Sequence, residues 1–273
     1  MNINAILEEI NKTDETFTER TDSRRKVISN FMGAGARIAL SAVPLALGGL
    51  FTKAYGKVPD KVIDVLNFAL TLEHLENRFY QTAMSTRGLV PAKDKINVIR
   101  DHEAAHVKFL EDVIRKSGGT PVSEQKYDFT AKGAYAGVFS DYKTFLVVAQ
   151  SFEDTGVAAY KGQATKIKSS YPEADQILTN ALQIHSTEAR HAAHIRFIRL
   201  LNGYATIKPW IIGTDNTKGQ PNEAIYQHEG DHRHFGINLK DIGGIDVANG
   251  ATASFDQPLR KEEVLKIVAP FMA

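Results

Sequence analysis

Two Glu-x-x-His motifs offer the clearest chemistry in this sequence, and each is preceded by a similar pair of residues. The motifs are Glu103–His106 and Glu188–His191. Upstream of each stands a lone glutamate with a tyrosine seven residues after it, and these pairs are Glu73 with Tyr80 and Glu153 with Tyr160. The spacing is closely similar in the two sets, so one half of the chain repeats the chemistry of the other.

Carboxylates and imidazoles in this arrangement are typical of a four-helix bundle with two metal ions in its core. Such a bundle takes one glutamate from each of two helices and one Glu-x-x-His from each of the other two. Residues three apart share a helix face, so Glu103 and Glu188 could each bridge the ions. We predict that two divalent metal ions, iron or manganese, are bound by Glu73, Glu103, His106, Glu153, Glu188 and His191.

Charge supports the metal hypothesis over its alternative, which is a set of salt bridges on a polar helix face. Four glutamates buried at one level of a bundle are strongly unfavourable unless they are neutralised. Two divalent cations carry four positive charges and balance them. Imidazole and carboxylate ligands favour iron or manganese, with zinc as a redox-silent substitute. Each ion would keep an open position for dioxygen or peroxide.

Three further residues are candidates for a supporting role around these ligands. Glu76 also faces inward and competes with Glu73 as a ligand, but only Glu73 repeats the spacing of Glu153 to its tyrosine. Tyr80 and Tyr160 are either hydrogen-bond or electron donors beside the ligands or simple core aromatics. We expect the other histidines near the motifs to lie outside the site; they are His74, His102, His185 and His194.

Hydrophobic periodicity predicts that four helices position these residues within residues 58–203. In the first helix, Leu66, Ala69, Glu73, Glu76 and Tyr80 follow at three- and four-residue steps, and the other three helices show the same pattern. The motif residues are in phase with the apolar stripes, so they should face the bundle axis. Gly118-Gly119 should end the second helix and Gly203 the fourth. A long connection at Thr120–Phe139 separates the two helix pairs, so the predicted fold class is an all-α four-helix bundle with one long crossover.

Composition excludes several classes of function. The net charge of +1 gives no electrostatic case for nucleic-acid binding. Cysteine is absent, which excludes thiolate nucleophiles, disulfides and cysteine-ligated iron–sulfur clusters.

The amino-terminal residues 1–54 resemble a twin-arginine export signal. Arg24 and Arg25 precede a moderately apolar stretch, which Arg37 and Pro44 interrupt. We therefore predict export, to the periplasm, with no membrane span after processing. The alternative is a cytoplasmic protein with an amino-terminal extension.

The carboxyl-terminal residues 204–273 are rich in Gly, Asn, Asp and Pro, and only Leu259–Val268 has a helical pattern. They contain too few large apolar residues for a core of their own, so we expect an irregular extension packed on the bundle. His228, Glu229, Asp231, His232 and His234 cluster in this extension. We expect a solvated loop there rather than a second metal site.

The bundle region resembles the ferritin-like superfamily, which includes bacterioferritins and rubrerythrins. Leu72–Glu76 with Phe79-Tyr80, Ser151–Asp154 with Ala159-Tyr160, and the ending Phe255–Leu259 are more closely similar to ferritin-like proteins related to plant desiccation-associated proteins. The resemblance implies a ferritin-like bundle and the same six ligands. Because cysteine is absent, a rubredoxin-like iron site is excluded.

The sequence is compatible with three functions. The first is a di-metal oxidase or peroxidase that consumes dioxygen or peroxide in stress protection. The second is iron binding or storage, and the third is a structural stress protein that keeps metal for stability. Assembly into a homo-oligomer is compatible with each.

Overall fold

The computed structural model describes residues 58–167, 173–212, 223–239 and 250–273 of the 273-residue chain. The export signal predicted at residues 1–54 lies outside the described residues and stays a prediction. No helix in the described ranges has the length and apolarity needed to cross a membrane.

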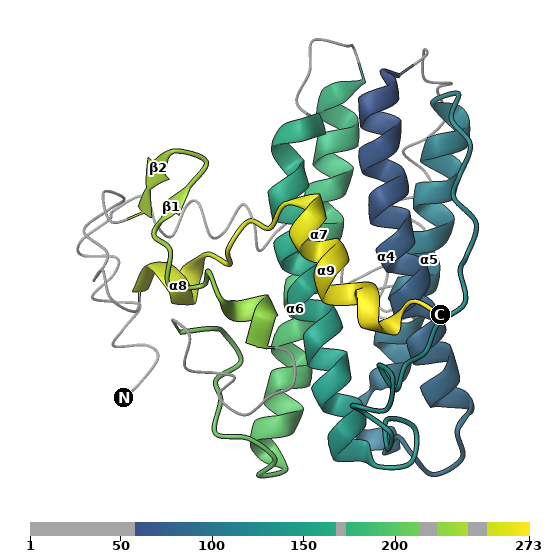
Figure 1. The fold of residues 1–273 in the computed structure, drawn as a ribbon, viewed down its shortest axis with the longest axis vertical. Helices are drawn as coiled ribbons and strands as arrows, with labels where there is room; N and C mark the ends of the chain where they lie inside the picture. The colour runs from purple at the N-terminus through teal and green to yellow at the C-terminus, as the bar shows by residue number, and fades with distance from the viewer. Residues whose placement is uncertain (1–57, 168–172, 213–222, 240–249) are drawn as a thin grey trace, which may run out of the picture. The chain divides into compact units, whose positions relative to one another are not determined.

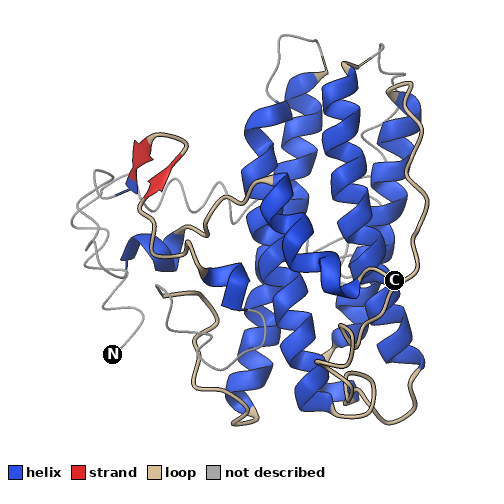
Figure 2. Cartoon of the chain, viewed as in Figure 1, coloured by secondary structure: helices blue, strands red, loops and turns tan. Residues whose placement is uncertain are grey.

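Four long helices form an all-α bundle, as the sequence predicts (Figures 1 and 2). They are α4 (Asp60–Ser85), α5 (Ile96–Lys116), α6 (Tyr142–Ile167) and α7 (Ala174–Leu201). Helix α4 packs along α5, α6 packs along α7, and the two pairs meet where α4 contacts α6. A short 3-10 helix, η1 (Ala92–Asp94), lies between α4 and α5, and residues 117–141 form the long crossover from α5 to α6.

Two helix ends show why the chain leaves the bundle where it does. Gly118 follows α5 with φ +80°, and Gly203 follows α7 with φ +68°, a region that side chains with a Cβ rarely adopt. At α5 the Gly118 N–H donates to the Arg115 carbonyl at 3.1 Å and the Gly119 N–H donates to the Ile114 carbonyl at 2.9 Å. This Schellman pattern satisfies carbonyls that the helix itself leaves free.

An aromatic cluster fixes α4 against α6 directly beside Tyr80. The ring of Phe79 stacks on Phe145 with centroids 5.0 Å apart and an interplanar angle of 9°. It meets the edge of Phe152 at 5.0 Å and lies 5.3 Å from Phe129 of the crossover. Phe79 is fully buried, so this contact holds the two helix pairs in register around the bundle axis.

The residues after α7 form short elements. They are η2 (Glu223–Tyr226), β1 (Arg233–His234), β2 (Ile237–Asn238), α8 (Gly250–Ser254), α9 (Lys261–Val268) and η4 (Ala269–Phe271). Strands β1 and β2 pair antiparallel through a Phe235-Gly236 turn, in which both residues have positive φ. The sequence pattern did not predict this hairpin, because two-residue strands carry no measurable periodicity.

Tyr226, in η2 of this extension, is anchored in a buried polar network on the bundle. Its hydroxyl donates to Asp154 of α6 and accepts from the Gln150 side-chain amide at 3.0 Å. Arg196 of α7 donates to both oxygens of Asp154, at 3.1 and 2.7 Å, and Arg199 donates to Gln150. A buried charge is tolerated only when it is paired and hydrogen-bonded; here Arg196 pairs with Asp154, and Tyr226 of the extension adds a hydrogen bond to the same carboxylate.

The backbone of the extension touches α6 closely at Gly162. The Leu259 N–H donates to the Ala158 carbonyl at 3.1 Å. A Cβ placed on Gly162 would lie 1.8 Å from the Leu259 carbonyl oxygen. Glycine at this position is therefore what lets the extension lie against the helix.

Replacing Gly162 with alanine should displace this contact. Alanine in a helix interior is favoured over glycine by about 1 kcal/mol, but the overlap with rigid backbone should outweigh that gain. We expect a net loss of about 1–2 kcal/mol in the free energy of unfolding, with faster proteolysis of residues after 203. Gly137→Ala is the matched control, because its new Cβ would meet nothing nearer than 3.6 Å. Equal or greater stability of Gly162→Ala than of the parent would contradict the observed docking.

Candidate metal centre

All four helices of the bundle contribute to one buried cluster of carboxylates and imidazoles. Glu73 comes from α4, Glu103 and His106 from α5, Glu153 from α6, and Glu188 and His191 from α7. The four glutamates have 0 % exposure. The structure thus brings together all six residues that the sequence singles out, in two groups that could each hold a metal ion.

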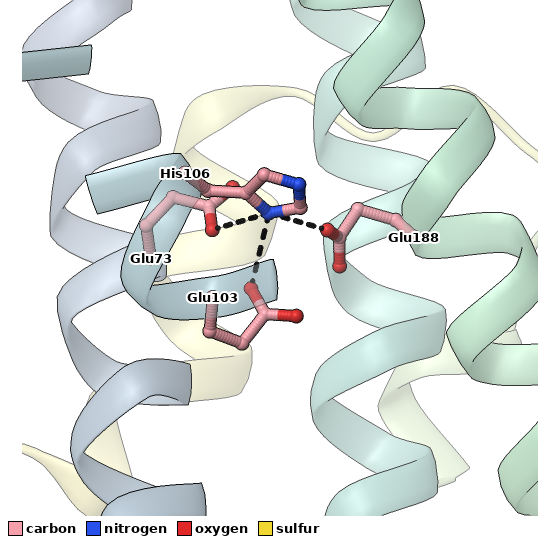
Figure 3. A group of neighbouring side chains, drawn as sticks. All are labelled: Glu73, Glu103, His106 and Glu188. Atoms are coloured by element: carbon pink, nitrogen blue, oxygen red, sulfur yellow. Dashed lines mark hydrogen bonds and ion pairs between the residues drawn. The ribbon is translucent and has the colours of Figure 1, made fainter. Parts of the chain in front are cut away.

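The first group surrounds the ring of His106 (Figure 3). Its Nδ1 lies 3.1 Å from Glu73 Oε2, 3.2 Å from Glu103 Oε2 and 3.1 Å from Glu188 Oε1. One ligand atom from each of these four residues lies within 4.8 Å of every other. Three carboxylates and one imidazole nitrogen thus converge from three helices.

The second group surrounds His191. Its Nδ1 lies 2.9 Å from Glu103 Oε1, 3.3 Å from Glu153 Oε2 and 3.9 Å from Glu188 Oε1. Glu103 and Glu188 belong to both groups. Glu103 directs Oε2 to the first group and Oε1 to the second, so its carboxylate lies between them.

The directions of these contacts fit a cation better than hydrogen bonds. Within the described residues, Glu103 Oε1, Glu153 Oε2, His191 Nδ1 and both oxygens of Glu188 have no hydrogen-bond partner, although they are buried. Such atoms are rare in folded proteins, and a bound ion is one of their standard explanations. Four of these five atoms, all but Glu188 Oε2, converge in the second group around His191. The donor set therefore fits divalent metal ions.

The two tyrosines reach across the bundle to the lone glutamate of the other half. Tyr80 donates to Glu153 Oε1, and Tyr160 donates to Glu73 Oε1 at 2.5 Å. In each case the tyrosine engages one carboxylate oxygen and leaves the other facing a histidine. Burial raises the pKa of both hydroxyls, and the nearby glutamates raise it further, so both tyrosines keep their protons.

His102 contacts the cluster, contrary to the sequence-based expectation. Its Nδ1 lies 2.9 Å from His191 Nε2, and the two rings stack at 5.1 Å. Burial, together with the charge of His191, lowers the pKa of His102 to about 4, so it is neutral and can accept the His191 Nε2 proton. That leaves His191 Nδ1 turned to the carboxylates. His102 lies outside the apolar phase of its helix, which is why the pattern misses it.

The other histidines that the sequence left outside the site do lie elsewhere. His194 contacts the Asp94 carbonyl at 2.7 Å, and His74 contacts the Val122 carbonyl at 3.2 Å. In the extension, His234 contacts Lys161 at 2.9 Å, and both His234 and Glu229 are buried, so the expectation of a solvated loop is wrong for these two residues. Among the described residues, the only groups that could hold a metal ion are the two in the bundle.

Glu76 lies beside the cluster but belongs to neither group. A Cβ on Gly156 would lie 3.3 Å from Glu76 Oε1 and 3.3 Å from Glu188 Oε2, so glycine leaves room beside both carboxylates. Burial, followed by repulsion from Glu188, raises the pKa of Glu76 well above its usual value. Glu76 thus favours its neutral, protonated form more strongly than a glutamate in water does.

The electrostatics of the metal-free cluster show how strongly it lacks positive charge. Burial raises the pKa of Glu73 to about 7, and burial with repulsion from Glu103 raises that of Glu188 well above its usual value. Burial opposes the charge on His106 and His191, but the surrounding glutamates raise the pKa of both well above 6.5. Protons therefore take the place of cations here, and metal binding would release them.

Replacing Glu188 with glutamine should stabilise the metal-free protein. Because folding raises the pKa of Glu188, its stabilising contribution is complete below pH 4.5 and is lost as the pH rises toward the folded value. Glutamine removes this loss, so urea unfolding in chelator at neutral pH should show a gain of about 1–3 kcal/mol. Below pH 4.5 the gain should vanish. A destabilised variant in chelator at neutral pH would contradict the repulsion.

Comparison with known proteins agrees with the helical bundle. No match was found among curated proteins. A family model described as the ferritin-like domain matches residues 61–200, which is more than half of the chain and spans all six residues of the two groups. The closer resemblance to desiccation-associated proteins is not tested by this match. The chain belongs to the ferritin-like domain family.

Proposed function

We propose that the protein is a di-metal carboxylate protein that binds two iron or manganese ions and reacts with dioxygen or peroxide in stress protection. One observation carries the proposal. Two groups of buried ligands share Glu103 and Glu188, and three of their converging oxygens, Glu103 Oε1, Glu153 Oε2 and Glu188 Oε1, have no hydrogen-bond partner within the described residues. Shared carboxylates are what a pair of neighbouring ions requires.

Charge and donor type support two ions of this kind. The four glutamates of the two groups carry four negative charges when ionised, and two divalent cations balance them. All donors are oxygen or imidazole nitrogen, because the chain has no cysteine, and this set suits iron or manganese. When bound, such ions would supply redox chemistry toward dioxygen or peroxide.

The residues around the ligands would hold them in place. Tyr80 and Tyr160 restrain Glu153 and Glu73 through hydrogen bonds, and His102 restrains the ring of His191. Outer contacts of this type orient metal ligands and tune their basicity. The buried Phe79 cluster beside Tyr80 excludes bulk water from that side.

Location and assembly form part of the proposal. The paired arginines of residues 1–54 support export through the twin-arginine route to the periplasm. Export of a chain already folded around its metal would suit that route. A homo-oligomer is compatible with this function and is not required by it.

Metal content and oxidation kinetics test the proposed function. The purified full chain, loaded without oxygen, should bind two iron(II) or manganese(II) ions, and the iron form should be oxidised by dioxygen or peroxide. Glu103→Ala and Glu188→Ala should each lower bound metal below two per chain, because each removes a shared ligand. Glu111→Ala is the matched control, since Glu111 lies on α5 and pairs with Arg115 at the surface. Two bound ions without any oxidation would instead favour storage or a structural role.

Loss of His102 should weaken metal binding without removing a ligand. Because His102 restrains His191 through a 2.9 Å contact, His102→Ala should lower metal affinity about 10–100-fold. His74→Ala, which loses a contact to a backbone carbonyl away from the cluster, is the control. Competition with a chromophoric chelator measures the metal affinity of both variants. If the metal affinity of His102→Ala equals that of the parent, His102 has no role in supporting the metal ligands.

A further inference from the structure

An apolar cavity, partly open to solvent, lies between the helices of the bundle and is lined by side chains from all four. Its volume is about 20 Å³. The lining is mostly aliphatic and aromatic, and includes Leu66, Ala69, Leu72, Phe109, Leu110 and Ala181. Polar side chains in the lining are few: Tyr160, Gln163 and Asn180. The two groups of metal-binding side chains do not use this space.

The cavity occupies the layer of the bundle next to the candidate metal centre. Ala69 stands about one helical turn before Glu73, and Leu110 stands about one turn after His106. Ala181 stands about two turns before Glu188 on α7. Helices α4 and α7 run in the same direction and α5 runs opposite to them, so all three positions fall on the same side of the cluster.

Tyr160 belongs to both the cavity and the metal centre. Its side chain lines the cavity, while its hydroxyl donates to Glu73 Oε1 at 2.5 Å. The exposed fraction of Tyr160 is 8 %, whereas that of Tyr80, its counterpart in the other half, is 0 %. The repeat is therefore asymmetric, and the cavity lies on the Tyr160 side.

Size and polarity define what this cavity can hold. About 20 Å³ is room for one small molecule, since a single water needs roughly 10–15 Å³ on the same measure. Apolar cavities stay free of water and admit apolar ligands such as xenon. Hydrogen peroxide has two hydroxyl donors that would need partners, and burying them without partners is unfavourable. Dioxygen has no such requirement.

We propose that this cavity holds dioxygen beside the candidate metal centre, with Tyr160 as its inner wall. The inference rests on the proposed function and extends it by selecting dioxygen over peroxide as the oxidant that the bundle admits. Asn180 is compatible with this occupant. Its Oδ1 already accepts from Gln176 at 3.0 Å, so it is not free to accept from a hydroxyl of peroxide, and its uncharged Nδ2, which has no hydrogen-bond partner in the described part of the chain, demands no charged ligand.

Xenon tests the cavity independently of any reaction. The full-length protein under xenon pressure should show one saturable site by xenon NMR and xenon density among Leu66, Ala69 and Ala181 in crystals. Ala181→Leu should fill the cavity and abolish that site. Ala134→Leu is the matched control, because Ala134 is exposed in the crossover and its enlargement leaves the cavity unchanged. Absence of xenon from the parent cavity would overturn the proposal.

Oxidation kinetics then test the occupant. With iron(II) loaded to the same level, Ala181→Leu should slow oxidation by dioxygen about tenfold, which corresponds to about 1.4 kcal/mol. Oxidation by hydrogen peroxide should stay within about twofold of the parent, a change of under 0.5 kcal/mol. Ala69→Leu should fill the same cavity from α4. It is the variant to test if Ala181→Leu fails to fold.

The outcomes separate this inference from the proposed function. If Ala181→Leu loses xenon but keeps the parent rate with dioxygen, the cavity is not the route and the inference fails, while the proposed function stands. Equal slowing with both oxidants would also overturn it, because the variant would then have disturbed the metal centre. If the parent protein neither binds nor oxidises iron, the proposed function itself fails, whether or not xenon binds in the cavity.

Discussion

Burial of four carboxylates at one level of a helical bundle is the constraint on which the rest of this structure depends. Glu73, Glu103, Glu153 and Glu188 have no exposure to solvent, and their mutual repulsion adds to the unfavourable desolvation. Two histidines at the same level provide some positive charge when metal is absent. A pair of divalent cations would provide it more completely, because each brings two charges without needing a donor direction.

The surroundings of the cluster make this constraint tolerable. Each lone glutamate is held by a tyrosine from the opposite helix pair, so the hydrogen bonds that support the cluster also tie α4 to α6. The Phe79 ring stack supports the same interface from the apolar side. Chemistry and packing are therefore coupled here. A change that separates α4 from α6 would disturb both lone glutamates at once.

The carboxyl-terminal extension adds a second buried polar network to the outer side of α6 and α7. Asp154 follows Glu153 directly, yet it faces Arg196 and Tyr226 instead of the cluster. Successive helix residues point about 100° apart, so one helix can serve both networks. The extension thus stabilises the helices that carry half of the ligands while remaining outside the metal centre.

Much of the fold and the ligand set follows from the sequence, because both depend on local periodicity. The phase of Glu103 and His106 with their apolar stripe puts them on the inner face of a helix, and the glycines at 118 and 203 mark where helices end. Residue spacing along one helix determines its faces. It therefore predicts which residues point inward, and the duplicated motif predicts that they meet.

Relations between helices are decided only by the tertiary structure. The crossing of Tyr80 to Glu153 and Tyr160 to Glu73, the stacking of His102 on His191, and the cavity on the Tyr160 side all depend on distances between different helices. Periodicity within one helix carries no information on these distances. The sequence by itself determined the inward-facing ligands, and packing decided which neighbours restrain them and where space remains.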